Sequence, residues 1–425
     1  MEARPSLASF PVDWDGLPTD LLRSIGELLD VPCCIRFRGV CRSWRAALPA
    51  MPPPWLVIPD GGYPTLMDHF TFVSLPTRRC ALWALPGSRC VGSSAGWLAL
   101  LDPSLSVTLL NPLTHAQVRL PPLRRDGHLY PSPFGGVNSD GSPEYFHVGP
   151  PPDKRICTVQ YKLIQKVAFS ANPTVQDHAV AVLCRYGLGL AFTRAGLGDW
   201  QWLHWPDAAG HGRPDVGELN GGSNTDLDIV YHDGKFYYMT RCGWIWTLNA
   251  DAAAPTPVTP VPFVKCRPRL GPDHRRYGKH LVFSQDGMLH VVWSDGPGLP
   301  METRARLMRM HVQTYHPGSS RPRRWRKARH LSGQAFLIGS RSHSLAVPAS
   351  LASAPSTWIR PNCVYFTCIM PGSDYINGES VEVLPPEIWE FNVKTGVFRE
   401  CDRRDIPDSD WLEWPKAIWF TPSLL

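Results

Sequence analysis

The chain has 425 residues, 43% of them hydrophobic, and 43 Lys and Arg against 37 Asp and Glu give a formal net charge of +6. This length allows a small module plus one large globular domain. No run approaches the roughly 18 uninterrupted apolar residues of a membrane span, and the first dozen residues lack the apolar core of a signal peptide. We therefore expect a protein of the cytoplasm or nucleus.

Cysteine and motif content argue against a metal or cofactor. The 12 cysteines are scattered without a C-x-x-C pair, which favours reduced thiols packed as small apolar groups. The sequence contains no H-E-x-x-H, no phosphate-binding loop of the Walker type and no G-x-S-x-G turn. We expect no metal, no cofactor and no catalytic residues.

Residues 14–48 predict three short helices. Pro18 fixes a φ that suits a helix start, and Asp20 suits the positive end of the helix dipole. Pro32 is expected to stop the first helix. The second is predicted around residues 33–38 and the third over residues 40–48, with Val40, Trp44 and Leu48 on one face. The apolar residues of the first helix recur at helical spacing as Leu21, Leu22, Ile25, Leu28 and Leu29.

Three helices of this size have too little interior to bury so many large apolar side chains. The surplus can face a partner, or the helices can be an ordinary cap packed on the rest of the chain. Residues 1–50 carry six Arg and six Asp or Glu, so no net charge would steer a partner to them. A contact there would depend on apolar burial.

The pairs Leu17-Pro18 and Leu21-Leu22, with Ile25 and then the run VCRSWR at 40–45, resemble the F-box. That motif docks substrate receptors onto the Skp-type adaptor of SCF (Skp–cullin–F-box) ubiquitin ligases. The resemblance implies an F-box over residues 12–50, and cullin and RING subunits reached through the adaptor. It also implies adaptor-facing or core roles for Leu17, Pro18, Leu21, Leu22, Ile25, Val40, Cys41 and Trp44.

A proline-rich hinge over residues 51–56 is predicted to separate this module from a second domain over residues 57–425. The second domain consists of short apolar runs typical of strands, with turn residues between them. Tight turns are predicted at 232–235, 284–287 and 394–396, and the Asp-Gly pairs in the first two indicate positive φ at both central positions. The predicted strands are 97–101, 107–110, 166–169, 179–184, 188–192, 228–231, 235–240, 243–248, 280–283, 288–293, 364–367 and 387–393.

Some 370 residues of short hairpins would leave many strand edges exposed. Radial repetition protects such edges, and the length fits a β-propeller of six or seven blades at about 40 to 50 residues each. Residues 93–98, 109–114, 166–170, 228–237 and 361–366 resemble, in this order, pieces of the F-box-associated β-propeller domain of the plant KIB-type family. Members of that family carry an N-terminal F-box before the propeller. The expected fold is a small all-α F-box of three helices followed by an all-β domain.

Charge is unevenly placed in the second domain. Residues 265–341 carry 16 Lys or Arg against 4 Asp or Glu, whereas residues 371–425 carry 5 against 11. The basic run 321–329 can be a solvated loop before a strand near residue 329, a docking surface for an acidic target segment, or a nucleic-acid or nuclear-import signal. The acidic run 400–410 can complement it through ring closure or form an exposed face. The candidates for target binding are Arg323, Arg324, Trp325 and Arg326.

These observations predict a non-catalytic substrate receptor of an SCF-type ubiquitin ligase. The helical module would bind the adaptor, and the propeller would hold an unknown target protein near the ubiquitin-charged enzyme. The alternative is a propeller that binds glycans or nucleic acid, or is an enzyme, with an incidental helical cap. An enzyme or lectin would need converging carboxylates or metal ligands, and the sequence indicates no such set. Nucleic acid and membranes are not expected partners.

Overall fold

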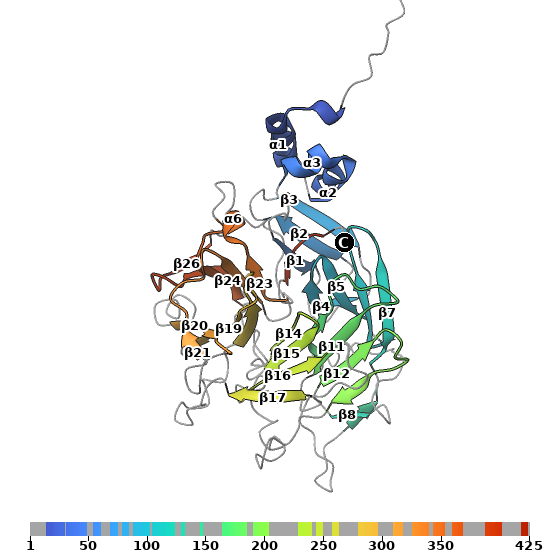
Figure 1. The fold of residues 1–425 in the computed structure, drawn as a ribbon. Helices are drawn as coiled ribbons and strands as arrows, with labels where there is room; N and C mark the ends of the chain where they lie inside the picture. The colour runs from blue at the N-terminus through green and yellow to red at the C-terminus, as the bar shows by residue number, and fades with distance from the viewer. Residues whose placement is uncertain are drawn as a thin grey trace, which may run out of the picture.

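A computed structural model describes residues 14–29, 31–48, 54–60, 69–74, 79–84, 88–102, 104–123, 129–131, 145–147, 164–184, 190–203, 228–239, 244–249, 257–262, 279–295, 309–317, 325–339, 343–352, 359–368, 387–401 and 418–423. Three short helices lie together at one end of the molecule, and strands make up nearly all of the rest (Figure 1). None of the helices within these ranges has the length and apolar character needed to cross a membrane.

The helical module begins with a 3₁₀ turn, η1 (Trp14–Gly16), followed by α1 (Thr19–Leu28), α2 (Val31–Val40) and α3 (Arg42–Ala47). The three predicted helices are confirmed, but two boundaries were wrong. Pro32 does not stop α1; it lies in the first turn of α2, where the missing N–H would have no helical partner anyway. Val40 ends α2 instead of starting α3, so the predicted face shared with Trp44 does not form.

The strands form six sheets of four or five strands, with one further two-stranded sheet, within the residues that the structure describes. The first sheet contains β1 (Trp55–Asp60), β2 (His69–Ser74), β3 (Arg79–Ala84) and β27 (Ile418–Phe420). The second contains β4 (Arg89–Ser94), β5 (Trp97–Leu101), β6 (Ser106–Leu110) and β7 (Gln117–Pro122). The third contains β10 (Ile164–Phe169), β11 (Ala179–Cys184), β12 (Leu190–Arg194) and β13 (Gln201–Leu203).

The fourth sheet contains β14 (Asp228–His232), β15 (Lys235–Met239), β16 (Trp244–Asn249) and β17 (Pro257–Pro262). The fifth contains β18 (Lys279–Phe283), β19 (Leu289–Asp295), β20 (Arg309–Tyr315) and β21 (Trp325–Lys327). The sixth contains β22 (Ala335–Ile338), β23 (Leu345–Val347), β24 (Cys363–Cys368), β25 (Glu387–Asn392) and β26 (Phe398–Glu400), with α6 (Ala349–Ala352) between β23 and β24. The two-stranded sheet pairs β8 (Leu129–Pro131) with β9 (Tyr145–His147).

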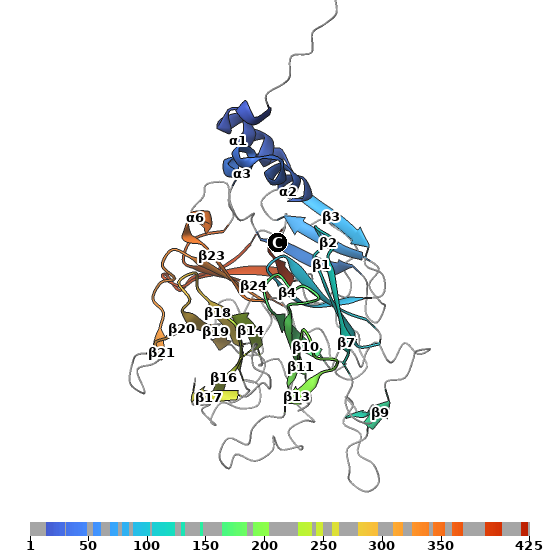
Figure 2. The same cartoon turned by 45° about the vertical axis from the view of Figure 1, so that its right-hand side comes forward.

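The six sheets follow one another in chain order, giving a propeller-like domain (Figure 2). One edge strand of each sheet lies beside that of the next, in the order β27, β4, β10, β14, β18 and β23. A cluster of buried apolar side chains fills the space between each sheet and its neighbour, and one such cluster joins the sixth sheet to the first. Because neighbours cover both faces, β10 and β11 are buried along their whole length.

The two ends of the β domain meet in the first sheet. The last strand, β27, pairs antiparallel with β1, placing Trp419 opposite Leu56. The indole Nε1 of Trp419 donates a hydrogen bond to the Ile338 carbonyl in the sixth sheet (3.0 Å), and its own carbonyl accepts one from Ser93 Oγ in the second (2.6 Å). Trp419 therefore connects three sheets.

Every strand predicted from the sequence is present, but three local expectations were wrong. No strand starts near residue 329, because β21 ends at Lys327 and the chain then turns through Ser332 and Gly333 at positive φ. At 284–287 only Gly287 has positive φ, whereas both central residues of the 232–235 turn do. Trp55, expected in the hinge, opens β1 and is buried; residues 51–53 of that hinge lie outside the described residues.

Candidate functional site

The predicted adaptor-binding residues divide between the core and the surface of the helical module. Leu22 is 1% exposed and packs with Phe37 and Ala47 at the centre of the three helices. Other members of the predicted set pack against this centre and are half-buried: Leu17, Ile25 and Trp44. Pro18, Leu21 and Val40 are exposed, and Cys41 is half-buried as the N-cap residue of α3.

Trp44 belongs to the core of the module. Its ring lies 4.4 Å from that of Phe37, and its Nε1 donates a hydrogen bond to the Trp14 carbonyl (2.9 Å). Arg38 ties α2 to the end of α3 by donating from Nη1 to the carbonyls of Arg45 (3.1 Å) and Leu48 (2.8 Å). Phe37 was not predicted as a core residue, because it lies in the C-C-I-R-F run, which has no clear helical periodicity.

The apolar residues of α1 form two stripes instead of the single one predicted. Leu22 points to the centre of the module, whereas Leu21 and Leu28 are 46% and 69% exposed. Leu21 and Leu28 are seven residues apart, so they lie two turns apart on one face of the helix. Trp14 and Val40, 59% and 56% exposed, add to the apolar surface of the module. Leu28 was missed as a site residue, although its spacing from Leu21 could have revealed it.

A buried ion pair crosses the β domain. Lys166 Nζ on β10 lies 2.5 Å from Asp228 Oδ1 on β14, and the two side chains are 1% and 3% exposed. The same Oδ1 accepts the Ile229 N–H (2.9 Å), and Oδ2 accepts the Leu281 N–H of β18 (2.8 Å). Both charges are therefore matched, as burial requires. This pair joins the third, fourth and fifth sheets and leaves no reactive group.

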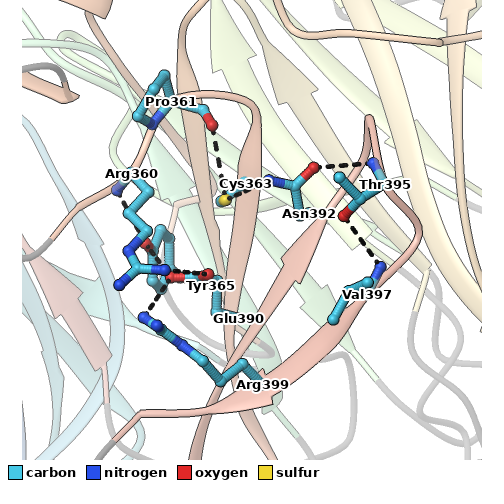
Figure 3. Close-up of polar contacts among 9 residues, drawn as sticks. All are labelled: Arg360, Pro361, Cys363, Tyr365, Glu390, Asn392, Thr395, Val397 and Arg399. Carbon is cyan, nitrogen blue, oxygen red and sulfur yellow. Dashed lines mark hydrogen bonds and ion pairs between the residues drawn. The ribbon is translucent and has the colours of Figure 1, made fainter.

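A second polar cluster lies in the sixth sheet around Glu390, which is 4% exposed (Figure 3). Glu390 Oε2 accepts a hydrogen bond from Tyr365 Oη (2.7 Å) and lies 3.4 Å from Arg399 Nη2. Its Oε1 lies 3.8 Å from Arg360 Nη1. Burial, together with the bond to Glu390, raises the pKa of Tyr365. Burial raises the pKa of the neighbouring Cys363 thiol to about 12, so this cysteine is not a thiolate nucleophile at neutral pH.

The basic run 321–329 is described only from residue 325 on. Trp325 is half-buried, with its ring 5.0 Å from that of Tyr315, and packs on the cluster between the fourth and fifth sheets. Arg326 is exposed. Because successive strand residues point to opposite faces, Trp325 and Arg326 do not form one surface. Arg323, Arg324 and the acidic residues 402–410 lie outside the described residues.

A family model described as the KIB1-4 beta-propeller matches residues 65–399. The chain belongs to the KIB1-4 β-propeller family. The resemblance drawn from the sequence is thereby confirmed. Leu56 and Trp419, which bring the first sheet into the closing cluster with the sixth, lie outside the matched residues.

Curated relatives of this KIB1-4 propeller protein match over part of their length. It is 38% identical over 120 residues to the F-box protein SKIP23 of Arabidopsis thaliana, which covers 26% of this chain and 29% of that protein. A second Arabidopsis F-box protein is 28% identical over 126 residues, covering 27% and 33% of the two chains. The chain thus spans about a third of the length of the curated relatives it matches.

Among solved structures, the Swd1 β-propeller domain of Myceliophteria thermophila is similar at 9% sequence identity and a TM-score of 0.35, with 83% of this chain and 90% of that domain covered. That score is too low to add to the family assignment.

The described part of the KIB1-4 propeller offers no constellation for acid–base chemistry. Burial lowers the pKa of His290 to about 4 and that of His343 to about 3, so both are neutral at pH 7. A small pocket lined by Ser93, Ser94, Ala95, His343, Leu345, Trp419 and Thr421 contains no carboxylate. No three potential metal ligands come together anywhere in the described ranges.

Proposed function

We propose that this chain is the substrate-recognition subunit of an SCF-type ubiquitin ligase. Its helices α1–α3 are an F-box that docks on a Skp-type adaptor, and its propeller binds a target protein for ubiquitination. Cullin and RING subunits join through the adaptor. The observation that carries the proposal is the apolar surface of α1, where Leu21 and Leu28 remain exposed although the module has its own core.

The architecture that we infer for the receptor is an F-box over residues 12–50 and a propeller that begins at β1. We take the six large sheets as six blades, because six buried clusters each join one sheet to the next and the last joins the sixth sheet to the first. The chain would then be non-catalytic and act in the cytoplasm or nucleus by holding its target near the ubiquitin-charged enzyme.

Co-purification of the full chain with a Skp-type adaptor tests this proposal. We expect a one-to-one complex on size-exclusion chromatography that survives both about 150 mM and about 500 mM salt, because apolar contacts are not screened as phosphate-type contacts are. The variant Leu21→Asp/Leu28→Asp should lose the complex. Burying each leucine is worth about 1.5–3 kcal/mol, so losing both weakens binding by a factor of about 100 or more.

A matched control places the same substitutions elsewhere. Val175 and Val397 are exposed valines on turns of the propeller, 65% and 58% exposed. The variant Val175→Asp/Val397→Asp should retain the adaptor. Absence of a complex with the unmodified chain would refute the proposal, and full retention by the α1 variant would refute the assignment of this surface. Trp44 is unsuitable for the test, because its contact with Phe37 makes it part of the core.

A further inference from the structure

The cluster around Glu390 holds two arginines over one buried carboxylate. Arg360 precedes β24, Glu390 lies on β25 and Arg399 on β26, so three segments of the sixth sheet contribute (Figure 3). The side chain of Glu390 is 6% exposed, whereas those of Arg360 and Arg399 are 55% and 47% exposed. The buried end of the cluster is therefore acidic, and the end that faces solvent is basic.

Charge in this cluster does not balance. Two guanidinium groups face a single carboxylate, which leaves one positive charge without a counter-charge among the described residues. Each guanidinium carries five N–H donors. Each makes one contact with Glu390, at 3.8 Å for Arg360 and 3.4 Å for Arg399, longer than the roughly 2.7–2.9 Å of a strong charge-assisted bond. Most of their donors thus have no partner in the part of the chain that the structure describes.

Tyr365 fixes the geometry of the two arginines. Its Oη donates to Glu390 Oε2 (2.7 Å) and accepts the backbone N–H of Arg360 (2.8 Å), so it connects the carboxylate to the segment that carries Arg360. Arg399 lies directly opposite Glu390 in the β25–β26 pairing. The backbone of both arginines is therefore held in place before binding, which lowers the entropy lost when their guanidinium groups bind an anion.

We propose that Arg360 and Arg399 together bind a carboxylate from an acidic segment of the target protein. This inference rests on the proposed function, since it assigns part of the target contact to the propeller. One carboxylate balances the excess charge of the cluster, whereas a phosphate dianion would exceed it. The planar fork of a guanidinium matches a carboxylate with paired hydrogen bonds. A nucleic acid would require an extended row of cations along its backbone.

Fluorescence anisotropy of the full chain with a labelled peptide of alternating Glu and Gly tests the site. We expect the Glu peptide to bind more tightly than the same peptide with Gln in place of Glu or with phosphoserine in place of Glu. The variant Arg360→Gln/Arg399→Gln should bind the Glu peptide about 10 to 100 times more weakly, a loss of about 1.4–2.7 kcal/mol, because it removes both guanidinium groups.

The matched control is Lys394→Gln/Arg119→Gln, which removes the same charge from two exposed residues outside the cluster around Glu390. Its affinity should change less than about twofold. An equal loss in the control, no binding by the unmodified chain, or tighter binding of the phosphoserine peptide would each overturn the proposal.

Two further measurements cover the case in which the double variant does not fold, and distinguish this proposal from the proposed ligase role. If the double Gln variant does not fold by circular dichroism, Arg360→Lys and Arg399→Lys keep the charge over Glu390 but lose the planar fork, and each should weaken the Glu peptide about tenfold. Unchanged binding in both would refute the site. Adaptor co-purification of each variant separates the two proposals: retained adaptor with lost peptide supports this site, whereas lost adaptor with retained peptide refutes only the ligase role.

Discussion

Through the buried residue His290, the stability of the protein depends on pH. The residue lies on β19, is 7% exposed, and has its Nδ1 at 3.0 Å from Thr314 Oγ1 and its ring 5.0 Å from that of Phe336. Burial lowers its pKa to about 4, although the charge of Asp286 partly opposes this. In the unfolded chain this histidine has a pKa of about 6.5, so the unfolded chain takes up the proton first as the pH falls. Stability from this residue is complete above about pH 6.5 and is lost between there and about pH 4.

We predict that His290→Gln removes part of the acid sensitivity of the protein. Between about pH 7 and 5 the free energy of unfolding of the natural chain should fall by about 2 kcal/mol through this residue, and the variant should lack that contribution. Urea unfolding at several pH values measures the difference. His330→Gln, at an exposed position, should behave as the natural chain. Equal slopes for His290→Gln and the natural chain would contradict the prediction.

At the residue scale, sequence patterns identified which side chains are apolar but not where each one points. Leu21 and Leu22 are adjacent and chemically identical, yet one is 46% and the other 1% exposed. The direction depends on how α1 packs against α3, and that contact involves Gly26, where a Cβ would lie within 2.1 Å of Leu48 Cδ2. The ion pair between Lys166 and Asp228 could not be predicted from the sequence either, because its two residues are 62 positions apart.

The backbones of the second and third sheets come into contact where β4 meets β10. At Gly92 a Cβ would lie 2.3 Å from the carbonyl oxygen of Val167, so only glycine permits this approach. The β4–β5 pairing also shifts register between Cys90 and Gly92. The contact is between two backbones, which cannot move apart without separating the second and third sheets.

We predict that Gly92→Ala destabilises the protein by about 2 kcal/mol or more, because overpacking costs about 1–3 kcal/mol and here the obstacle is backbone. Thermal unfolding followed by circular dichroism measures the change. Gly198→Ala is the control, since nothing lies within 4 Å of a Cβ at that position. A Gly92→Ala chain that melts with the natural one would show that the sheets can move apart freely.

Two of the strands that were not predicted from the sequence contain prolines. β7 ends in Pro121 and Pro122, and β17 contains three prolines. Both lie at the edge of their sheets, where a missing N–H leaves no ladder bond unmade. These prolines make the strands hard to recognise in the sequence, and they also keep the edge of each sheet from pairing with other chains.

At the scale of the molecule, the strands of each large sheet follow chain order except in the first sheet, which includes the last strand β27, and in the sixth. There β22 pairs parallel with β24 and antiparallel with β23, so the strand beside the fifth sheet is not the first one in the sequence. The sequence does not reveal that β22 and β23 exchange places in the sheet, because both strands are short and apolar. The sequence predicted six or seven repeats, and six large sheets lie within the described residues.

Closure of the β domain depends on β27. A chain that ends after residue 417 should fail to fold cooperatively, since it loses the pairing with β1 and the buried side chains of Ile418, Trp419 and Phe420. Losing one buried Trp or Phe costs about 3–5 kcal/mol, and the total stability of a domain is about 5–15 kcal/mol. Size-exclusion chromatography and limited proteolysis report the result. A chain that ends after residue 423 should remain intact; a monomeric, protease-resistant chain without β27 would contradict the prediction.

The pairing of β1 with β27 also sets an order of events during protein synthesis. About 360 residues separate the two strands, and at about 5–20 residues per second the ribosome needs tens of seconds to reach the second after making the first. Throughout that interval the helices α1–α3 have already emerged, while one side of β1 lacks its partner and offers an open template to any other nascent strand. The helical module thus emerges long before the β domain can close, and the edge of β1 stays exposed for the whole interval.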